Sequence, residues 1–181
     1  MVGIISALVG KIRFRRDPIS AARRLGVRIG DNCRFFGVTA ATFGSEPYLV
    51  SMGDRVTVTG DGTRFITHDG GVDVLRENHP GIDLVAPIRL GSRVFVGYNA
   101  IILPGVTIGD DVVIGAGSIV TKSFPEGGVV LAGVPARPLK SIEEYRRNVL
   151  ANAIPTKGLN AEQKRAELML RFARTTIDPT R

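Results

Sequence analysis

The stretch LGSRVFVGYNAIILPGVTIGDDVVIGAGSIVTK, residues 90–122, repeats one pattern every six residues. Six aliphatic residues share this register: Leu90, Val96, Ile102, Ile108, Ile114 and Val120. Gly follows four of them, and a slot four residues after each of the first five holds a small or branched side chain: Val94, Ala100, Val106, Val112 and Ser118. Neither an α-helix, with a period of about 3.6, nor a strand, with a period of about 2, explains this spacing.

A β-solenoid does explain it, because short β segments joined by corners bring the same side chain inward on every face and stack it on the coil below. The Gly that follows four of the six aliphatic residues is typical of a turn. The competing interpretation is an α/β protein with Val-rich strands, which needs helical patterns of about 10–15 residues between strands. Residues 90–122 contain no such pattern, so the sequence predicts a mainly β solenoid.

The remaining sequence suggests three parts: an amphipathic, helical N-terminal segment (residues 1–25), the solenoid (26–140) and a helical C-terminal extension (141–181). The solenoid is interrupted at residues 69–87, which are rich in Gly, Pro and charge and predict a protruding loop. Three helix starts are expected. Asp17 precedes Pro18, Ser141 begins a capping box, and Asn160 precedes an amphipathic run.

Composition limits the class of protein. A single Cys33 excludes an intramolecular disulfide, and with two His it leaves no zinc signature, so no metal is expected and a reducing cytoplasm is favoured. The net charge of +7 is concentrated near the N-terminus, in Lys11, Arg13, Arg15, Arg16, Arg23, Arg24 and Arg28. No aromatic platform accompanies this charge, which argues against nucleic acid.

The apolar residues 2–9 are too few to span a bilayer, and the positive charges follow them rather than precede them as in a signal peptide. Two interpretations of residues 2–16 remain open. The segment lies on the inner face of a membrane as a peripheral contact, or it packs on the end of the solenoid or on a neighbouring subunit.

Three tracts, ILPGVTIG (102–109), IGAGSIVTK (114–122) and GVPAR (133–137), resemble the hexapeptide-repeat acyltransferases. The resemblance covers about residues 25–140 and is strongest to the maltose, galactoside and capsular-sugar O-acetyltransferase branch. It implies a left-handed parallel β-helix, a homotrimer, acetyl-CoA as the acyl donor and active sites between subunits.

The family's catalytic histidine stands where the first block of coils ends, and His68 in FITHD occupies that place. Acetyl transfer to a hydroxyl needs a base for the hydroxyl proton, a role that suits imidazole. His79, in the loop, is the rival base, but a contact to the acceptor suits its position better than the role of base. Arg76 is the second candidate for contacting the acceptor. The branch often has an Asn one coil before the histidine, which cannot be placed here; Glu46 and Asp69 are the candidates for orienting His68.

The positions that resemble the family's contacts to the donor are Tyr98, Ala116, Thr121, Lys122, Arg137 and Lys140. Small residues leave room for the pantetheine arm, and the three cations suit the phosphates of coenzyme A. The alternative is that these cations are solvated ends of the solenoid.

The sequence therefore predicts an acetyl-CoA-dependent O-acetyltransferase acting on a sugar or a surface-polysaccharide precursor. Two alternatives remain open: an N-acetyltransferase of a nucleotide-linked amino sugar, and a non-catalytic solenoid that serves as a scaffold or a membrane-surface module.

Overall fold

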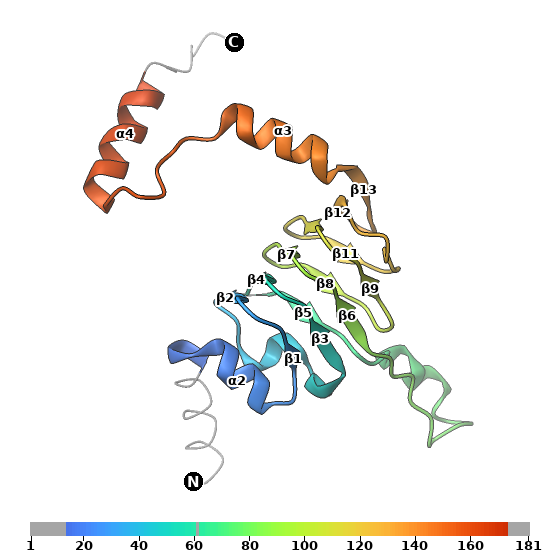
Figure 1. Cartoon of the computed structure of the whole chain (residues 1–181). Coiled ribbons are helices and arrows are strands. Elements are labelled where there is room, and N and C mark those ends of the chain that lie inside the picture. Colours follow the sequence, from blue (N-terminus) through green and yellow to red (C-terminus); the bar gives the residue numbers. More distant parts are fainter. Residues whose placement is uncertain (1–13, 61, 174–181) are drawn as a thin grey trace. The chain divides into compact units, whose positions relative to one another are not determined.

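A computed structural model describes residues 14–60 and 62–173, in which short strands build three sheets. The strands are β1 (Arg28–Ile29), β2 (Arg34–Phe36), β3 (Val50–Met52), β4 (Thr57–Thr59), β5 (Arg64–Phe65), β6 (Ile88–Leu90), β7 (Phe95–Val96), β8 (Ile101–Ile102), β9 (Thr107–Ile108), β10 (Val113–Ile114), β11 (Ile119–Val120), β12 (Val129–Gly133) and β13 (Ala136–Ser141). The sheet orders are β1-β3-β6-β9, β2-β4-β7-β10-β12-β13 and β5-β8-β11. All pairs but β12–β13 are parallel, and from β3 to β11 the chain visits the three sheets in turn (Figure 1).

The six-residue columns become stacked layers of the core. Leu90 pairs with Ile108, Val96 with Ile114, and Ile102 with Val120, so each coil takes 18 residues (108 − 90) and presents three faces. All six side chains are at most 5% exposed, and the second column from Val94 to Ser118 is at most 2% exposed. The predicted parallel β-helix is confirmed, with its apolar columns inside.

The role predicted for the repeated Gly is wrong, because these residues do not make the turns. At Gly97 a side-chain carbon would lie 2.5 Å from the Ala116 nitrogen, so Gly is required where one coil crosses closely over the next. The turns lie two residues later, in left-handed conformations (φ +57° to +80°) that also recur every six residues: Arg93, Asn99, Gly105, Asp111 and Gly117. Close stacking, and not turning, accounts for the aliphatic-Gly pair at Gly91, Gly97 and Gly109.

The first coil is irregular and contains no strand in line with β5 among the described residues. In its place lie two 3₁₀ helices, η1 (Ala40–Phe43) and η2 (Pro47–Leu49). Phe43 is fully buried and stacks on Phe65 of β5, with ring centres 5.6 Å apart, and the tilted Phe35 ring lies 6.0 Å from it. The rings fill the space that a third strand would occupy, and the backbone between η1 and η2 carries Glu46 to the end of β5.

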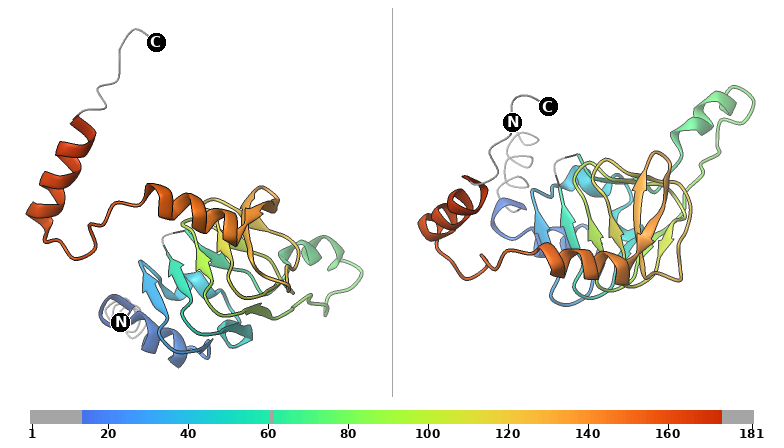
Figure 2. Two further views of the ribbon diagram at one scale, coloured as in Figure 1. Left: turned by 45° about the horizontal axis from the view of Figure 1, so that its top comes forward. Right: turned by 90° about the horizontal axis from the view of Figure 1, so that it is seen from above.

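The predicted loop leaves the solenoid after β5 and returns before β6. Its base is held as a short antiparallel pair: Asp69 donates its N–H to Leu84 O (2.8 Å), and Ala86 donates to Thr67 O (2.8 Å). The 3₁₀ helix η3 (Gly70–Leu75) follows directly, and the loop projects away from the three sheets (Figure 2). The scaffold therefore fixes both ends of a protruding segment.

Helix α2 (Pro18–Arg24) precedes the first coil, and Asp17 caps it by accepting a hydrogen bond from the Ser20 N–H (3.0 Å). Ala21 and Ala22 are buried against the solenoid core. The amphipathic segment predicted for residues 2–16 lies, up to residue 13, outside the described residues.

The chain divides into two units, residues 1–145 and 146–181. Helix α3 (Ile142–Asn152) begins at the predicted cap, where Ser141 Oγ accepts from the Glu144 N–H (3.1 Å). Helix α4 (Ala161–Ala173) begins with a reciprocal pair between Asn160 and Gln163. Neither helix has a buried side chain.

Candidate active site

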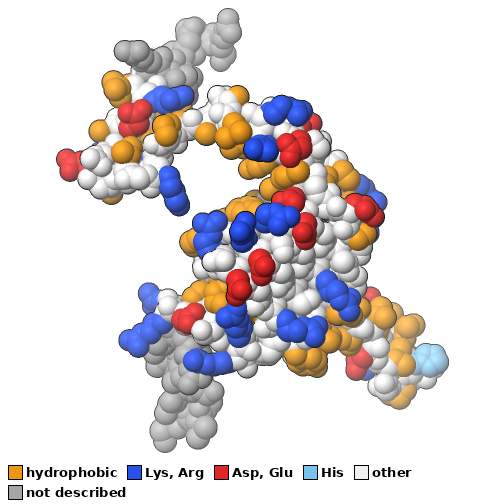
Figure 3. Space-filling view, viewed as in Figure 1, with side chains coloured by type: hydrophobic (Ala, Val, Ile, Leu, Met, Phe, Trp, Pro, Cys, Tyr) orange, Lys and Arg blue, Asp and Glu red, His pale blue; other side chains and the backbone are white. Residues whose placement is uncertain are grey.

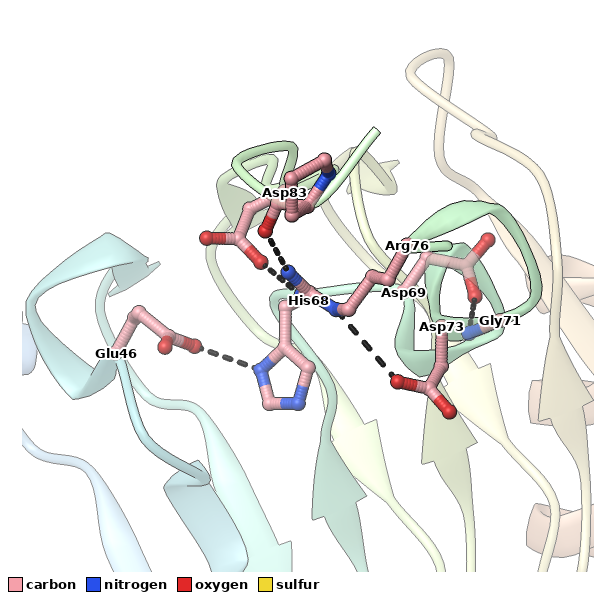
Figure 4. Close-up of polar contacts among 8 residues, drawn as sticks. Glu46, His68, Asp69, Gly71, Asp73, Arg76 and Asp83 are labelled. Atoms are coloured by element: carbon pink, nitrogen blue, oxygen red, sulfur yellow. Dashed lines mark hydrogen bonds and ion pairs between the residues drawn. The ribbon is translucent and has the colours of Figure 1, made fainter. Parts of the chain in front are cut away.

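His68 lies three residues after β5, where the protruding loop begins, and its side chain meets Glu46 from the irregular first coil. The Nδ1 atom lies 2.9 Å from Glu46 Oε2, and the opposite ring nitrogen points away from the carboxylate (Figure 4). The His68 side chain is 43% exposed and that of Glu46 is 21% exposed. The imidazole is therefore held on one side and open on the other.

The Glu46 carboxylate is itself fixed by Thr67, which is fully buried. The Thr67 hydroxyl donates to the same Oε2 atom at 2.7 Å. This hydrogen bond, followed by the one from His68, lowers the pKa of Glu46 below its ordinary value. Glu46 is thus ionised at neutral pH and can only accept hydrogen bonds.

An acceptor at Nδ1 determines the tautomer of a neutral imidazole. Because ionised Glu46 has no proton to give, Nδ1 must carry the hydrogen, and Nε2 then presents a lone pair. A histidine in this state is arranged to take a proton from a group that approaches Nε2.

Asp69, the second candidate for orienting His68, has another role in the structure. Its Oδ1 atom accepts a hydrogen bond from the Gly71 N–H (2.8 Å) and caps η3. Asp69 therefore shapes the start of the loop next to His68, whereas Glu46 is the carboxylate that contacts the ring.

Two cavities meet at His68. The first, of about 550 Å³, lies beneath the loop and has a polar, charged lining that includes Glu46, Asp69, Asp73, Arg76 and Asp83. The second, of about 400 Å³, lies on the outer face of the β5-β8-β11 sheet and is mainly apolar, with Ile66, Leu84, Leu103, Pro104 and Thr121 around His68 and Asp69. One imidazole is thus shared by a polar and an apolar chamber.

The register divides the predicted donor contacts into groups. Tyr98 and Ala116 are one coil apart at one corner, where the Gly117 N–H donates to Tyr98 O (2.7 Å). Arg137 pairs with Ala132, which lies over Gly115, so it belongs to the same corner. Tyr98 is 50% exposed and Arg137 is also exposed.

Tyr98 and Ala116 precede strands of the β5-β8-β11 sheet, whereas Thr121 and Lys122 follow β11, at the opposite ends of its strands. Thr121 lines the apolar cavity beside His68. The Lys122 ammonium lies 5.5 Å from the centre of the Phe124 ring. Lys140 stands further along β13 and contacts Glu144 at 4.0 Å. The three predicted phosphate cations therefore do not form one cluster in the single chain.

The two predicted acceptor residues behave differently. Arg76 lines the polar cavity, but its guanidinium is already engaged, at 2.6 Å from Asp83 Oδ1 and 3.6 Å from Asp73 Oδ1 (Figure 4). His79 is exposed and lines neither cavity. The structure gives His68, and not His79, the carboxylate partner expected of a base.

Sequence reasoning missed Thr67, Asp73, Asp83 and the apolar wall. The wall could have been found, because Ile66, Leu103 and Thr121 directly follow the stacked column Phe65, Ile102 and Val120 and therefore point outward. No sequence pattern marks Thr67 as a site residue. Its role depends on contact with Glu46, which the irregular first coil brings next to it.

Comparison with known proteins agrees with this architecture. The hexapeptide repeat of succinyl-transferase matches residues 87–122. Protein CapG of Staphylococcus aureus is 51% identical over 162 residues, which cover 90% of this chain and 93% of CapG. Galactoside O-acetyltransferase of Escherichia coli K12 is 38% identical over 138 residues, 76% of this chain and 65% of that protein. A hexapeptide-repeat containing acetyltransferase from Vibrio cholerae shares the fold, with a TM-score of 0.51, 23% identity, and coverage of 68% of this chain and 78% of that one.

A solenoid of stacked hexapeptides is the architecture that this chain shares with these relatives. The chain belongs to the hexapeptide-repeat acetyltransferase family, and its fold is that family's left-handed parallel β-helix. Within the family it is similar to CapG along nearly its whole length.

Proposed function

We propose that this protein transfers an acetyl group from acetyl-CoA to a hydroxyl of a sugar or of a surface-polysaccharide precursor. The observation that carries the proposal is the Glu46–His68 pair placed between a polar and an apolar cavity. The similarity to galactoside O-acetyltransferase, whose name states an oxygen acceptor on a sugar, supports the choice of reaction.

In the proposed mechanism the acceptor occupies the polar cavity and its hydroxyl approaches Nε2 of His68. The hydroxyl oxygen attacks the thioester carbonyl while its proton moves to Nε2, which forms an imidazolium. Glu46 keeps the Nδ1 hydrogen in place and stabilises the new positive charge. The attack gives a tetrahedral intermediate. When it collapses, the carbon–sulfur bond breaks, and the imidazolium returns the proton to the leaving thiolate.

The donor fits the second cavity and the sheet beside it. Ile66, Leu103 and Pro104 offer apolar surface to the pantetheine arm, and His68 lies at the end of that surface where the thioester must come. The nucleotide end would then reach the corner of Tyr98, Ala116 and Arg137, where the guanidinium suits a phosphate. Lys122 and Lys140 stay in the proposal as further phosphate contacts, available to a donor that spans two subunits.

The active unit is proposed to be a homotrimer. The outer surface of the β5-β8-β11 sheet carries Ile66, Ile101, Leu103 and Ile119, each only partly covered in the single chain. The loop adds Val74, which is 85% exposed, and Leu84, which is 55% exposed. An apolar face beside an open cavity suits burial against a second copy.

We also propose that the protein is cytoplasmic and that its N-terminal end contacts the inner face of a membrane. Five arginines in α2 and the residues next to it are exposed: Arg15, Arg16, Arg23, Arg24 and Arg28. Lys and Arg side chains are visible at this end of the solenoid in Figure 3. Such a surface attracts anionic lipid. No helix of the described residues is long and apolar enough to cross a membrane. Vesicle flotation with and without anionic lipid tests the contact, and equal binding to neutral vesicles contradicts it.

The decisive experiment replaces the base. His68→Ala should lower kcat by roughly 10²- to 10⁴-fold, the usual worth of general acid–base catalysis, and leave the Kd for coenzyme A nearly unchanged. His79→Ala is the matched control, because its imidazole lines neither cavity. Full activity of the His68 variant refutes the mechanism. Failure of the native protein to bind coenzyme A would favour the scaffold interpretation instead.

A further inference from the structure

We propose that the cavity under the loop admits an uncharged sugar ring and excludes acceptors that carry a phosphate or carboxylate close to the reacting hydroxyl. The inference rests on the proposed function, since it concerns the acceptor side of the same site. It names the class of acceptor that the lining residues select.

The lining of this cavity has a strong excess of negative charge. Four carboxylates face one guanidinium, a net formal charge of −3 (1 − 4): Glu46, Asp69, Asp73 and Asp83 against Arg76. His68, acting as a base, adds no positive charge before the reaction. An anionic acceptor therefore enters against repulsion, and because Asp73 and Asp83 are exposed to solvent this repulsion is strongest at low ionic strength.

The one cation of the lining is not available to an anion. Arg76 holds Asp83 at 2.6 Å and Asp73 at 3.6 Å, and a third donor reaches the Pro80 carbonyl oxygen at 3.3 Å. To bind a phosphate, Arg76 would have to release these partners and open the loop. The arginine therefore fixes the loop and does not recognise a charged acceptor.

The carboxylates instead suit hydroxyl donors. An ionised carboxylate has up to four lone-pair sites and only accepts hydrogen bonds, and Asp69 uses one oxygen on Gly71. A sugar ring presents several O–H donors of the matching kind. The same negative field stabilises a protonated amine, which has no lone pair for attack, so it also disfavours transfer to an amino sugar.

The test compares pairs of sugars that have the same free hydroxyls and differ in charge: the methyl ester of glucuronic acid with glucuronic acid, 6-O-methylglucose with glucose 6-phosphate, and 2-deoxyglucose with glucosamine. Methyl glucoside is the neutral parent acceptor, and the galactose series is measured alongside. The neutral member should exceed its phosphorylated and carboxylated partners in kcat/KM by about 100-fold or more at low ionic strength. Raising the ionic strength from about 0.01 M to 0.1 M shortens the screening length from about 30 Å to 10 Å and should narrow this ratio several-fold.

Two variants and one control measure how much each carboxylate contributes to the exclusion of anionic sugars. Asp83→Asn removes a charge and also frees Arg76, so it should raise kcat/KM for the phosphorylated sugar about tenfold or more. Asp73→Asn removes a charge from the weaker pair and should raise it less. Glu126→Gln is the control, because it makes the same change at an exposed residue that lies outside the lining.

Equal use of neutral and anionic sugars by the native protein, or the same small response in all three variants, overturns the inference and leaves acetyl transfer intact. Acetylation of none of these sugars, neutral or charged, removes the proposed function and the inference with it. The kinetics on neutral sugars therefore separate the two failures.

Discussion

Residues 88–122 and the loop of residues 69–87 are both rich in aliphatic side chains, but the coils bury these side chains and the loop leaves them exposed. Ile102 and Ile114 are fully buried, whereas Val74 in the loop is 85% exposed. The coils bury a side chain because the one 18 residues away stacks on it, and the loop has no coil above or below. Register, and not hydrophobicity alone, decides which residues stabilise this fold and which remain available for contacts.

The comparison predicts that the loop can be removed from the fold but not from the function. Replacing residues 71–82 by a short Gly-Ser linker, with Asp69 and Asp83 kept, should lower kcat/KM roughly 10³-fold or more, because the acceptor loses its enclosing wall. Tm should change little, since η3 has no buried side chain and loops tolerate replacement. Calorimetry and acetyl-CoA turnover measure both. A large drop in Tm would show that the loop also stabilises the coils.

The opposite behaviour is expected inside the coils. Ile114 stacks between Val96 and Leu131, so Ile114→Ala should lower the free energy of unfolding by about 2–5 kcal/mol through lost burial and a cavity. At temperatures where the variant is folded, its KM values should stay near those of the native protein. Urea unfolding with parallel kinetics tests this. A loss below about 1 kcal/mol would mean that the stack relaxes freely.

Glu46 links the first coil to the root of the loop through Thr67 and His68, so its substitution should affect both activity and stability. Glu46→Gln loses a charge-assisted hydrogen bond worth about 1.5–3 kcal/mol, which corresponds to about 10- to 150-fold in kcat when the imidazolium forms. Glu46→Asp, which keeps the charge, should lose less. A kcat unchanged in the Gln variant would remove Glu46 from the mechanism.

The difference in stability between the native protein and Glu46→Gln should depend on pH in a defined direction. Because the folded protein lowers the pKa of Glu46, the carboxylate contributes stability at pH values above the unfolded value of about 4.3. That contribution disappears as the pH falls through the lower pKa of the folded state. The native protein should therefore exceed Glu46→Gln in stability at neutral pH, and the two should converge in acid.

The smallest effect is expected at Ser118, whose buried hydroxyl has no hydrogen-bond partner among the described residues. Ser118→Ala removes a polar group that lost its water on folding and should be neutral or stabilising by about 1 kcal/mol. Thermal unfolding is the measurement, and Val112→Ala in the same column is the control that should destabilise. A clear loss of stability would show that the hydroxyl has a partner after all.

Much of the fold was predictable because its causes are local and repeated. The columns from Leu90 to Val120, the loop ends and the caps at Asp17, Ser141 and Asn160 all follow from spacing. The first coil was less accessible, because Phe43 replaces a strand by packing on Phe65, a contact that no period encodes.

The site was partly predictable for the same reason. His68 stands at the end of a coil, so a motif locates it, and Glu46 was recognised about one coil upstream. The donor residues were named from resemblance, but their division between two edges depends on the stacking register. The charge of the acceptor cavity depends on Arg76, Asp73 and Asp83, which the loop brings together only when folded.

The final hairpin has a consequence for how far the stack can extend. Each coil of a parallel solenoid is a template for the next, so an uncapped end invites another molecule to continue it as a fibre. β12 still runs parallel to β10, but β13 turns back antiparallel and carries Pro138, which has no N–H to offer an incoming strand. The reversal of a single strand thus sets a finite length for a structure whose repeat contains no stop of its own.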